Sequence, residues 1–116
     1  MVSAQLLERS NTLSDADVVR RVVDGETALF EVLMRRHNER AYRAARAIVR
    51  DESEAEDVMQ QAYVSAYAHL RQFHGAAQLS TWLTRIVINE ALARVRRNGR
   101  YDPLDEERSS GATSRG

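Results

Sequence analysis

Apolar residues recur every three or four positions along most of the chain, which is the spacing of one face of an α-helix. A first helix is predicted after Ser14, an expected N-cap, and should end near Gly25. A longer helix is predicted over residues 27–50. The stripe expected to be buried in this longer helix comprises Phe30, Leu33, His37, Ala41, Ala45 and Ile48.

A third helix follows the polar break at residues 50–53. Ser53 and Glu56 have the spacing of a capping box, so we expect the helix to begin there and to run to about Gln72. The acidic residues of its first turn would be stabilised by the helix dipole. Its expected buried stripe is Ala55, Val58, Ala62, Ala66 and Leu70.

Residues 73–79 are interpreted as a loop, and Ser80 is expected to cap a fourth helix. Basic residues followed by Asn98 and Gly99 are typical of a helix end. The predicted fold class is therefore all-α, a compact bundle of three main helices plus a short N-terminal one, over residues 13–100. We expect a flexible N-terminus over 1–12 and a disordered linker or tail over 101–116.

Composition narrows the class of protein further. The chain of 116 residues contains no cysteine, which excludes disulfide frameworks and thiolate chemistry. It shows no signal peptide and no apolar run of the ~20 residues that span a bilayer, so we expect a cytoplasmic protein. All 17 basic residues are arginine. They dominate residues 35–50 and 85–100, whereas 51–57 is acidic, so a net charge of zero conceals strong local fields.

No pattern indicates catalysis or a metal site. The three histidines lack metal-ligand spacing, and His37 falls on an apolar stripe, where a core histidine with one hydrogen bond is expected. The acidic cluster at 51–57 is better explained as helix-dipole partners than as metal ligands. We expect no enzyme and no cofactor. Arginines with aromatic residues near a loop favour single-stranded nucleic acid, although basic amphipathic helices also bind acidic proteins.

Three ordered blocks make the assignment more specific. Residues 55–63 (AEDVMQQAY) resemble the A-E-D-x-x-Q-E-x-F signature of bacterial RNA polymerase sigma factors, and residues 80–89 (STWLTRIVIN) resemble the T-W-L-x-x-I-x-x-N block that follows it. Residues 24–30 resemble the opening of the same domain, and Arg96-Arg97 its basic end. The chain is similar to region 2 of the extracytoplasmic-function sigma factors.

This resemblance implies a docking face for core RNA polymerase. Asp57, Gln60 and Gln61 match the positions that bind the clamp helices of the β′ subunit. The family usually carries an acid at the position of Gln61, so docking here is expected to be weaker or tuned. Without the resemblance, the same three residues would be interpreted as a solvated helix surface.

The resemblance also implies a promoter DNA site. The loop between the third and fourth helices would receive a base flipped out of the −10 non-template strand, with His74 and Gln78 near its edge. Trp82 could stack on DNA or belong to the core, and Asn89 could read DNA or bond to another helix. The DNA-binding residues implied in and after the loop are His74, Gln78, Ser80, Thr81, Trp82, Arg85, Asn89, Arg94, Arg96 and Arg97.

The function implied is that of a sigma factor domain that binds core RNA polymerase and recognises and melts the −10 element. An anti-sigma protein is an expected partner, and no membrane insertion is expected. The alternative is a helical protein-interaction module without its own DNA readout. Family members continue into a second domain, so we expect this sequence, which ends at Gly116 in a linker-like segment, to be one domain of a longer protein.

Overall fold

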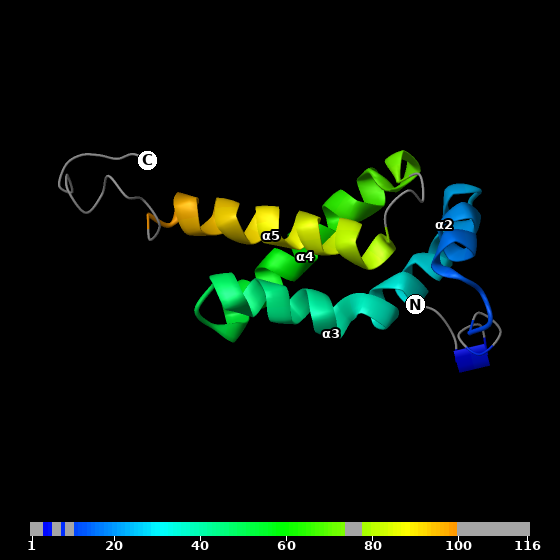
Figure 1. Cartoon of the computed structure of the whole chain (residues 1–116), viewed down its shortest axis with the longest axis horizontal. Coiled ribbons are helices and arrows are strands. Elements are labelled where there is room, and N and C mark those ends of the chain that lie inside the picture. The colour runs from blue at the N-terminus through cyan, green and yellow to red at the C-terminus, as the bar shows by residue number, and fades with distance from the viewer. Residues whose placement is uncertain (1–3, 6–7, 9–10, 74–77, 100–116) are drawn as a thin grey trace.

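The computed structural model describes residues 4–5, 8, 11–73 and 78–99, and within them it is helical. The elements are α2 (Asp15–Val23), η1 (Thr27–Leu29), α3 (Phe30–Ile48), α4 (Glu52–Ala68), η2 (Leu70–Gln72) and α5 (Leu79–Arg97). Helices α3 and α5 pack side by side and run in the same direction, and α4, which contacts both, runs in the opposite sense (Figure 1). Helix α2 packs at the end where α3 begins, which confirms a bundle of three main helices plus a short one.

The core has two parts. The bundle core lies between α3, α4 and α5, and its many alanines let the helices approach closely. The end core joins α2 and η1 to the start of α3, to η2 and to the start of α5. Every residue of the stripe predicted for the third helix is buried. The bundle core comprises Ala41, Ala45, Val49, Ala55, Val58, Met59, Ala62, Val87, Ala91 and Val95, and the end core Val18, Val19, Val22, Leu29, Val32, Leu33, Leu70 and Leu79.

The first cap and two helix ends are as predicted. Ser14 Oγ accepts from the backbone N–H of Asp17 at 3.1 Å, and α2 ends just before Gly25, whose φ of +120° suits glycine. The end of α5 at Asn98 and Gly99 is confirmed as well, with φ +74° at Gly99. The expected α-helix at 27–29 is instead a 3₁₀ turn, η1, before α3.

Two predicted caps are wrong. Helix α4 is capped by Asp51, whose Oδ1 accepts from the backbone N–H of Glu54 at 2.8 Å, so Ser53 lies inside the helix and no capping box forms at Ser53 and Glu56. Aspartate caps as well as serine, and it comes first in the chain. Helix α5 begins at Leu79, not after Ser80, because burial of Leu79 in the end core brings the first turn forward.

The third helix also ends earlier than predicted. Helix α4 stops at Ala68, and the chain continues through His69 into the 3₁₀ turn η2 as far as Gln72. The tighter turn places Leu70 in the end core and aims Phe73 toward α5. The expectations for the tail at 101–116, and for most of 1–12, lie outside the described residues.

Candidate functional site

One exposed face of α4 carries the three residues expected to bind polymerase. Asp57, Gln60 and Gln61 are exposed, and their spacing places them on neighbouring turns of one side. Val64 continues this side and is 65 % exposed. Val64 was not predicted for this side, although its helical spacing from Gln60 and Gln61 places it there. Amides and a carboxylate beside an exposed apolar side chain suit a protein partner.

A contact between α4 and α5 ties this face to the next helix. Arg94 Nη1 lies 3.3 Å from Asp57 Oδ2. Arg94 was expected to hold a DNA phosphate, but its guanidinium is directed toward α4. The carboxylate remains half exposed, so Asp57 is paired and still accessible from outside.

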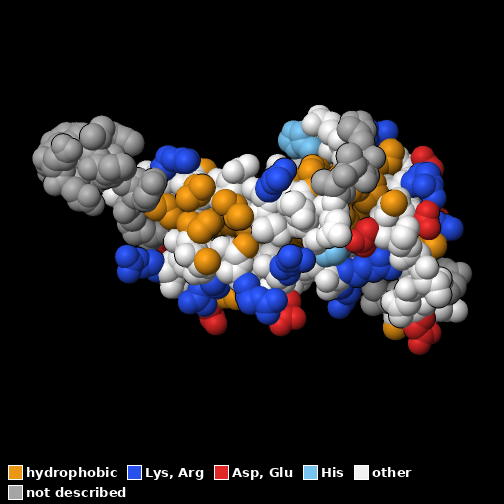
Figure 2. Space-filling view, viewed as in Figure 1, with side chains coloured by type: hydrophobic (Ala, Val, Ile, Leu, Met, Phe, Trp, Pro, Cys, Tyr) orange, Lys and Arg blue, Asp and Glu red, His pale blue; other side chains and the backbone are white. Residues whose placement is uncertain are grey.

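The outer side of α5 carries polar residues in a stripe. Thr81, Arg85 and Asn89 are exposed at intervals of four residues, and Arg96 and Arg97 are exposed at the end of the helix. The exposure of Asn89 favours contact with a ligand over a bond between helices. In Figure 2, arginine side chains lie along α3 and along α5, with hydrophobic side chains between them.

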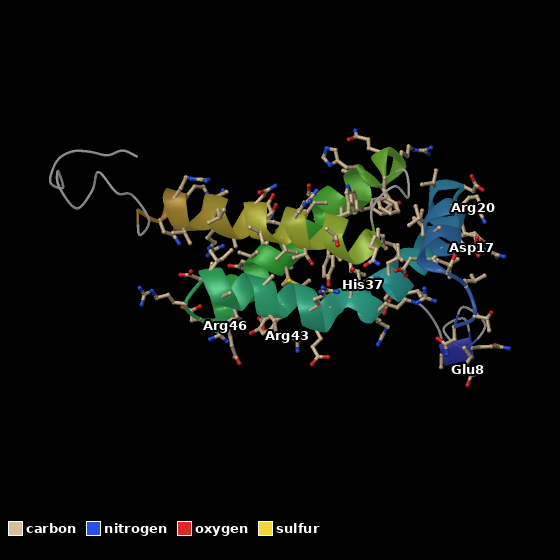
Figure 3. The ribbon with its side chains drawn as sticks, in the orientation of Figure 1. Glu8, Asp17, Arg20, His37, Arg43 and Arg46 are labelled. Carbon is tan, nitrogen blue, oxygen red and sulfur yellow. The ribbon has the colours of Figure 1, made fainter. Side chains whose placement is uncertain are left out.

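Both α3 and α5 carry some arginines that pair with acidic side chains and some that do not. Among the described residues, Arg85, Arg96 and Arg97 have no acidic partner within 4.0 Å. Arg43 and Arg46 lie on the edge of α3 away from α5 (Figure 3), and a hydrogen bond with Tyr42 raises the pKa of Arg46 above its usual value. The pairs on α3 are Arg35–Glu31 at 2.9 Å, Arg43–Glu39 at 3.4 Å and Arg36–Asp15 at 3.0 Å. Arg40 and Arg46 of α3 also have no acidic partner within 4.0 Å among the described residues, so unpaired cations lie on both helices.

The junction before α5 holds the residues expected near the flipped base. His74 lies outside the described residues, and Gln78 is exposed at the N-cap position of α5. Ser80 is only 9 % exposed, and its Oγ accepts from Arg40 Nη1 at 3.5 Å. Its burial leaves little hydroxyl surface for a direct DNA contact, so we remove Ser80 from the candidate DNA ligands.

Trp82 belongs mainly to the core. Its half-buried ring packs against the end core, and its centroid lies 5.4 Å from that of Phe73 at an interplanar angle of 52°. Offset and tilted ring pairs of this kind are favourable. The core interpretation of Trp82 therefore fits the structure better than stacking on DNA.

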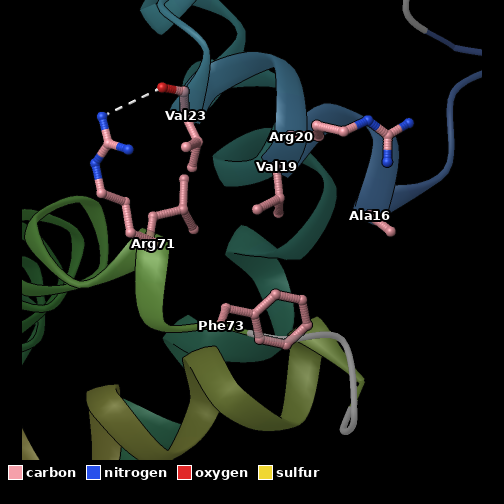
Figure 4. Close-up of a pocket in the computed structure, with 7 residues that line it drawn as sticks. Ala16, Val19, Arg20, Val23, Arg71 and Phe73 are labelled. Atoms are coloured by element: carbon pink, nitrogen blue, oxygen red, sulfur yellow. Dashed lines mark hydrogen bonds between the residues drawn. The ribbon is translucent and has the colours of Figure 1, made fainter.

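A hollow of about 280 Å³ lies between α2 and η2 (Figure 4). Its floor is apolar, and Arg20 and Arg71 stand on either side, with Arg71 Nη2 donating to the carbonyl of Val23 at 3.4 Å. Phe73 lines it directly before residues 74–77. Sequence analysis could not find this hollow, because only tertiary packing brings α2 beside η2. The lining residues are Ala16, Val19, Arg20, Val23, Leu70, Arg71 and Phe73.

The described part of the chain contains neither a metal-binding cluster nor a membrane-spanning helix. No group of three or more His, Asp or Glu residues there could hold a metal ion. His37 is half buried with one carboxylate partner, Asp15, as expected of a core histidine. None of the helices that the structure describes is long and apolar enough to cross a membrane.

Comparison with known proteins identifies the family. The model of sigma-70 region 2 matches residues 33–101, which is more than half of the chain. The ECF RNA polymerase sigma factor SigM of Mycobacterium tuberculosis is 39% identical over 84 residues, covering 72% of this chain and 43% of its own. The RNA polymerase sigma-H factor of Pseudomonas aeruginosa is 35% identical over 89 residues, covering 77% and 46%. The ECF RNA polymerase sigma-E factor of Escherichia coli is 32% identical over 97 residues, covering 84% and 50%.

The chain thus spans about half the length of the curated relatives it matches. The matched region includes most of α3 and all of α4, η2 and α5, so the exposed faces described above lie inside it. Taken with the all-α bundle and the ordered sequence blocks, this shows that the chain belongs to the sigma-70 region 2 family, in the group of extracytoplasmic-function sigma factors.

Proposed function

We propose that this domain acts in transcription initiation, binding core RNA polymerase through α4 and the −10 non-template strand through α5 and the preceding loop. The observation that carries the proposal is the set of exposed arginines on α5 without acidic partners among the described residues, beside a separate polar face on α4. The bundle thereby presents one face, on α4, to the polymerase and another face, on α5, to DNA. The domain performs no catalysis, which belongs to the polymerase, and its proposed location is the cytoplasm.

The DNA step rests on phosphate binding and base capture. Arg85, Arg96 and Arg97 would hold phosphates of the separated strand, while Asn89 faces the bases. Flipping a base costs a few kcal/mol of unstacking, so a loop that binds the extruded base selects sequence and opens the duplex in one step. His74 and Gln78 are the proposed readers, and Phe73, which precedes His74 in the sequence, lines the hollow between α2 and η2.

The polymerase step rests on complementarity to a basic coiled coil. Asp57 supplies a carboxylate, Gln60 and Gln61 supply amide groups, and Val64 supplies apolar area. These groups lie on one side of a single rigid helix, which favours a helical partner laid across it. An anti-sigma protein that covers either face would block the proposed function.

Binding of the 116-residue chain to an isolated β′ clamp coiled coil tests the docking face. Asp57→Arg places a cation against the basic partner and should weaken binding at least about tenfold, as expected for a like charge in an interface. Glu56→Arg is the matched control, since Glu56 is exposed on the same helix but on another side. Unchanged binding by Asp57→Arg would remove the docking face and leave a protein-interaction module of another kind.

A further inference from the structure

An ion pair between Asp57 and Arg94 joins α4 to α5. Arg94 Nη1 lies 3.3 Å from Asp57 Oδ2, with the arginine side chain 28% exposed and the aspartate side chain 53% exposed. The pair joins a residue of the docking face to a helix that carries the DNA-facing stripe. Within the described chain, Asp57 has no second cation within 4.0 Å.

Arg94 is partly buried where α5 meets α4. Its Nε is buried and has no hydrogen-bond partner among the described residues, and its neighbours Ala91 and Val95 belong to the bundle core. To swing outward to a phosphate, the Arg94 side chain would have to break its ion pair with Asp57. The exposed Arg96 and Arg97 of the same turn differ from it in this respect.

Asp57 keeps half of its carboxylate available. A carboxylate has two oxygens, each able to accept more than one hydrogen bond, and Arg94 engages only Oδ2. With Oδ2 held from inside, the rotamer of Asp57 is restricted and Oδ1 is left for an external donor. Fixing a side chain before binding lowers the entropy cost of association.

We propose that Arg94 is a positioning residue for polymerase docking, which orients Asp57 without touching the polymerase. This inference rests on the proposed function and adds a residue to it. Arg94 also carries a positive charge that opposes a basic partner. That repulsion acts from behind the carboxylate, at a longer distance than the attraction of Asp57, so orientation outweighs it.

A double-mutant cycle on the 116-residue chain tests the inference, with the β′ clamp coiled coil as probe. Arg94→Gln should raise the Kd about three- to tenfold, the effect expected from freeing one side chain. In the Asp57→Asn background the same change should have no further effect, because the residue it orients is gone. Arg43→Gln, which removes one exposed cation of α3 and its ion pair with Glu39, is the control for loss of a positive charge, and it should leave the Kd unchanged.

Two further readouts separate positioning from a merely structural role. Arg94→Gln should leave the salt dependence of single-strand DNA binding unchanged. If Arg94 were a phosphate ligand, its replacement would reduce that salt dependence. Circular dichroism checks the fold, and if Arg94→Gln does not fold, Arg94→Lys, which keeps the cation, takes its place and should retain most of the clamp affinity.

Each outcome decides the inference. An unchanged Kd for Arg94→Gln while Asp57→Asn weakens binding would overturn the inference alone. Equal weakening by Arg94→Gln in both backgrounds would also overturn it, since the effect would not pass through Asp57. An unchanged Kd for Asp57→Asn would overturn the docking face of the proposed function, and this inference with it.

Discussion

His37 Nε2 lies 2.9 Å from Oδ2 of Asp15, so one half-buried hydrogen bond joins α3 to α2. A carboxylate oxygen accepts hydrogen bonds, so the histidine nitrogen is the donor. The other oxygen, Oδ1, accepts from Arg36 Nη1 at 3.0 Å. Asp15 therefore fixes the short helix to the bundle through two side chains of α3.

Replacing Asp15 should loosen α2 selectively. We expect Asp15→Ala to lower the free energy of unfolding by about 1–2 kcal/mol, because charged hydrogen bonds in a half-buried position are lost. Amide hydrogen exchange should speed up at Val18, Val19 and Val22 and stay unchanged in α4 and α5. The control is Asp24→Asn, at an exposed position at the end of α2. Uniformly faster exchange throughout the bundle would contradict a local role.

The cap of α4 provides a paired test at two neighbouring positions. Asp51→Ala should destabilise the domain by about 1 kcal/mol, because the backbone N–H of Glu54 loses its acceptor. Ser53→Ala should change the free energy of unfolding by less than about 0.5 kcal/mol, since Ser53 is a solvent-exposed residue of the first turn of α4 and does not cap it. Urea denaturation measures both. A larger loss of stability for Ser53→Ala than for Asp51→Ala would contradict capping by Asp51 and support the capping box expected from the sequence.

The stability of the domain should fall at high pH because of Tyr63. Burial disfavours the phenolate and raises the pKa of Tyr63 from 10.0 to about 12. The unfolded chain loses this proton first, so between about pH 10 and 12 it binds fewer protons than the native state and the free energy of unfolding decreases as pH rises.

The matching variants separate ionisation from hydrogen bonding. Tyr63→Phe should remove this part of the pH dependence. Asn38→Ala should keep it while losing the bond that Tyr63 Oη donates to Asn38 Oδ1 at 2.7 Å. Urea titrations at several alkaline pH values compare the two. The same slope in wild type and Tyr63→Phe would show that the phenol is not responsible.

The salt dependence of DNA binding should identify the phosphate ligands. For a single strand, each lost phosphate contact should reduce the slope of log K against log salt by about 0.7. Arg85→Gln, Arg96→Gln and Arg97→Gln should each show such a loss. Arg35→Gln should not, because Arg35 lies on α3 and pairs with Glu31 at 2.9 Å. Fluorescence anisotropy at increasing salt provides the slopes, and equal slopes for all four variants would remove α5 from the DNA site.

The sequence predicts the helices well because their apolar spacing is regular. The stripe from Ala55 to Leu70 and the stop at Gly99 depend only on local pattern, and both hold. The prediction of a helix cap is wrong where tertiary packing determines the start of the helix. Leu79 is buried in the end core, so α5 begins at Leu79 and not after Ser80. Ser80 is buried and accepts a hydrogen bond from Arg40.

In the candidate site, too, features set by one helix could be predicted from the sequence, whereas contacts between helices could not. Exposure of Gln60, Gln61 and Arg85 follows from helical periodicity and could be predicted. The turning of Arg94 toward Asp57 depends on how α4 and α5 meet, which no single-helix pattern contains. For the same reason the hollow between α2 and η2 could not be found from the sequence.

Selection from a pool of short single-stranded DNAs of random sequence tests the central claim most directly. If the junction before α5 captures an extruded base, the bound strands should share a short motif, and Gln78→Ala should weaken or change that motif while binding through phosphates persists. Bound strands without any common motif, retained equally by wild type and Gln78→Ala, would contradict base capture by this domain.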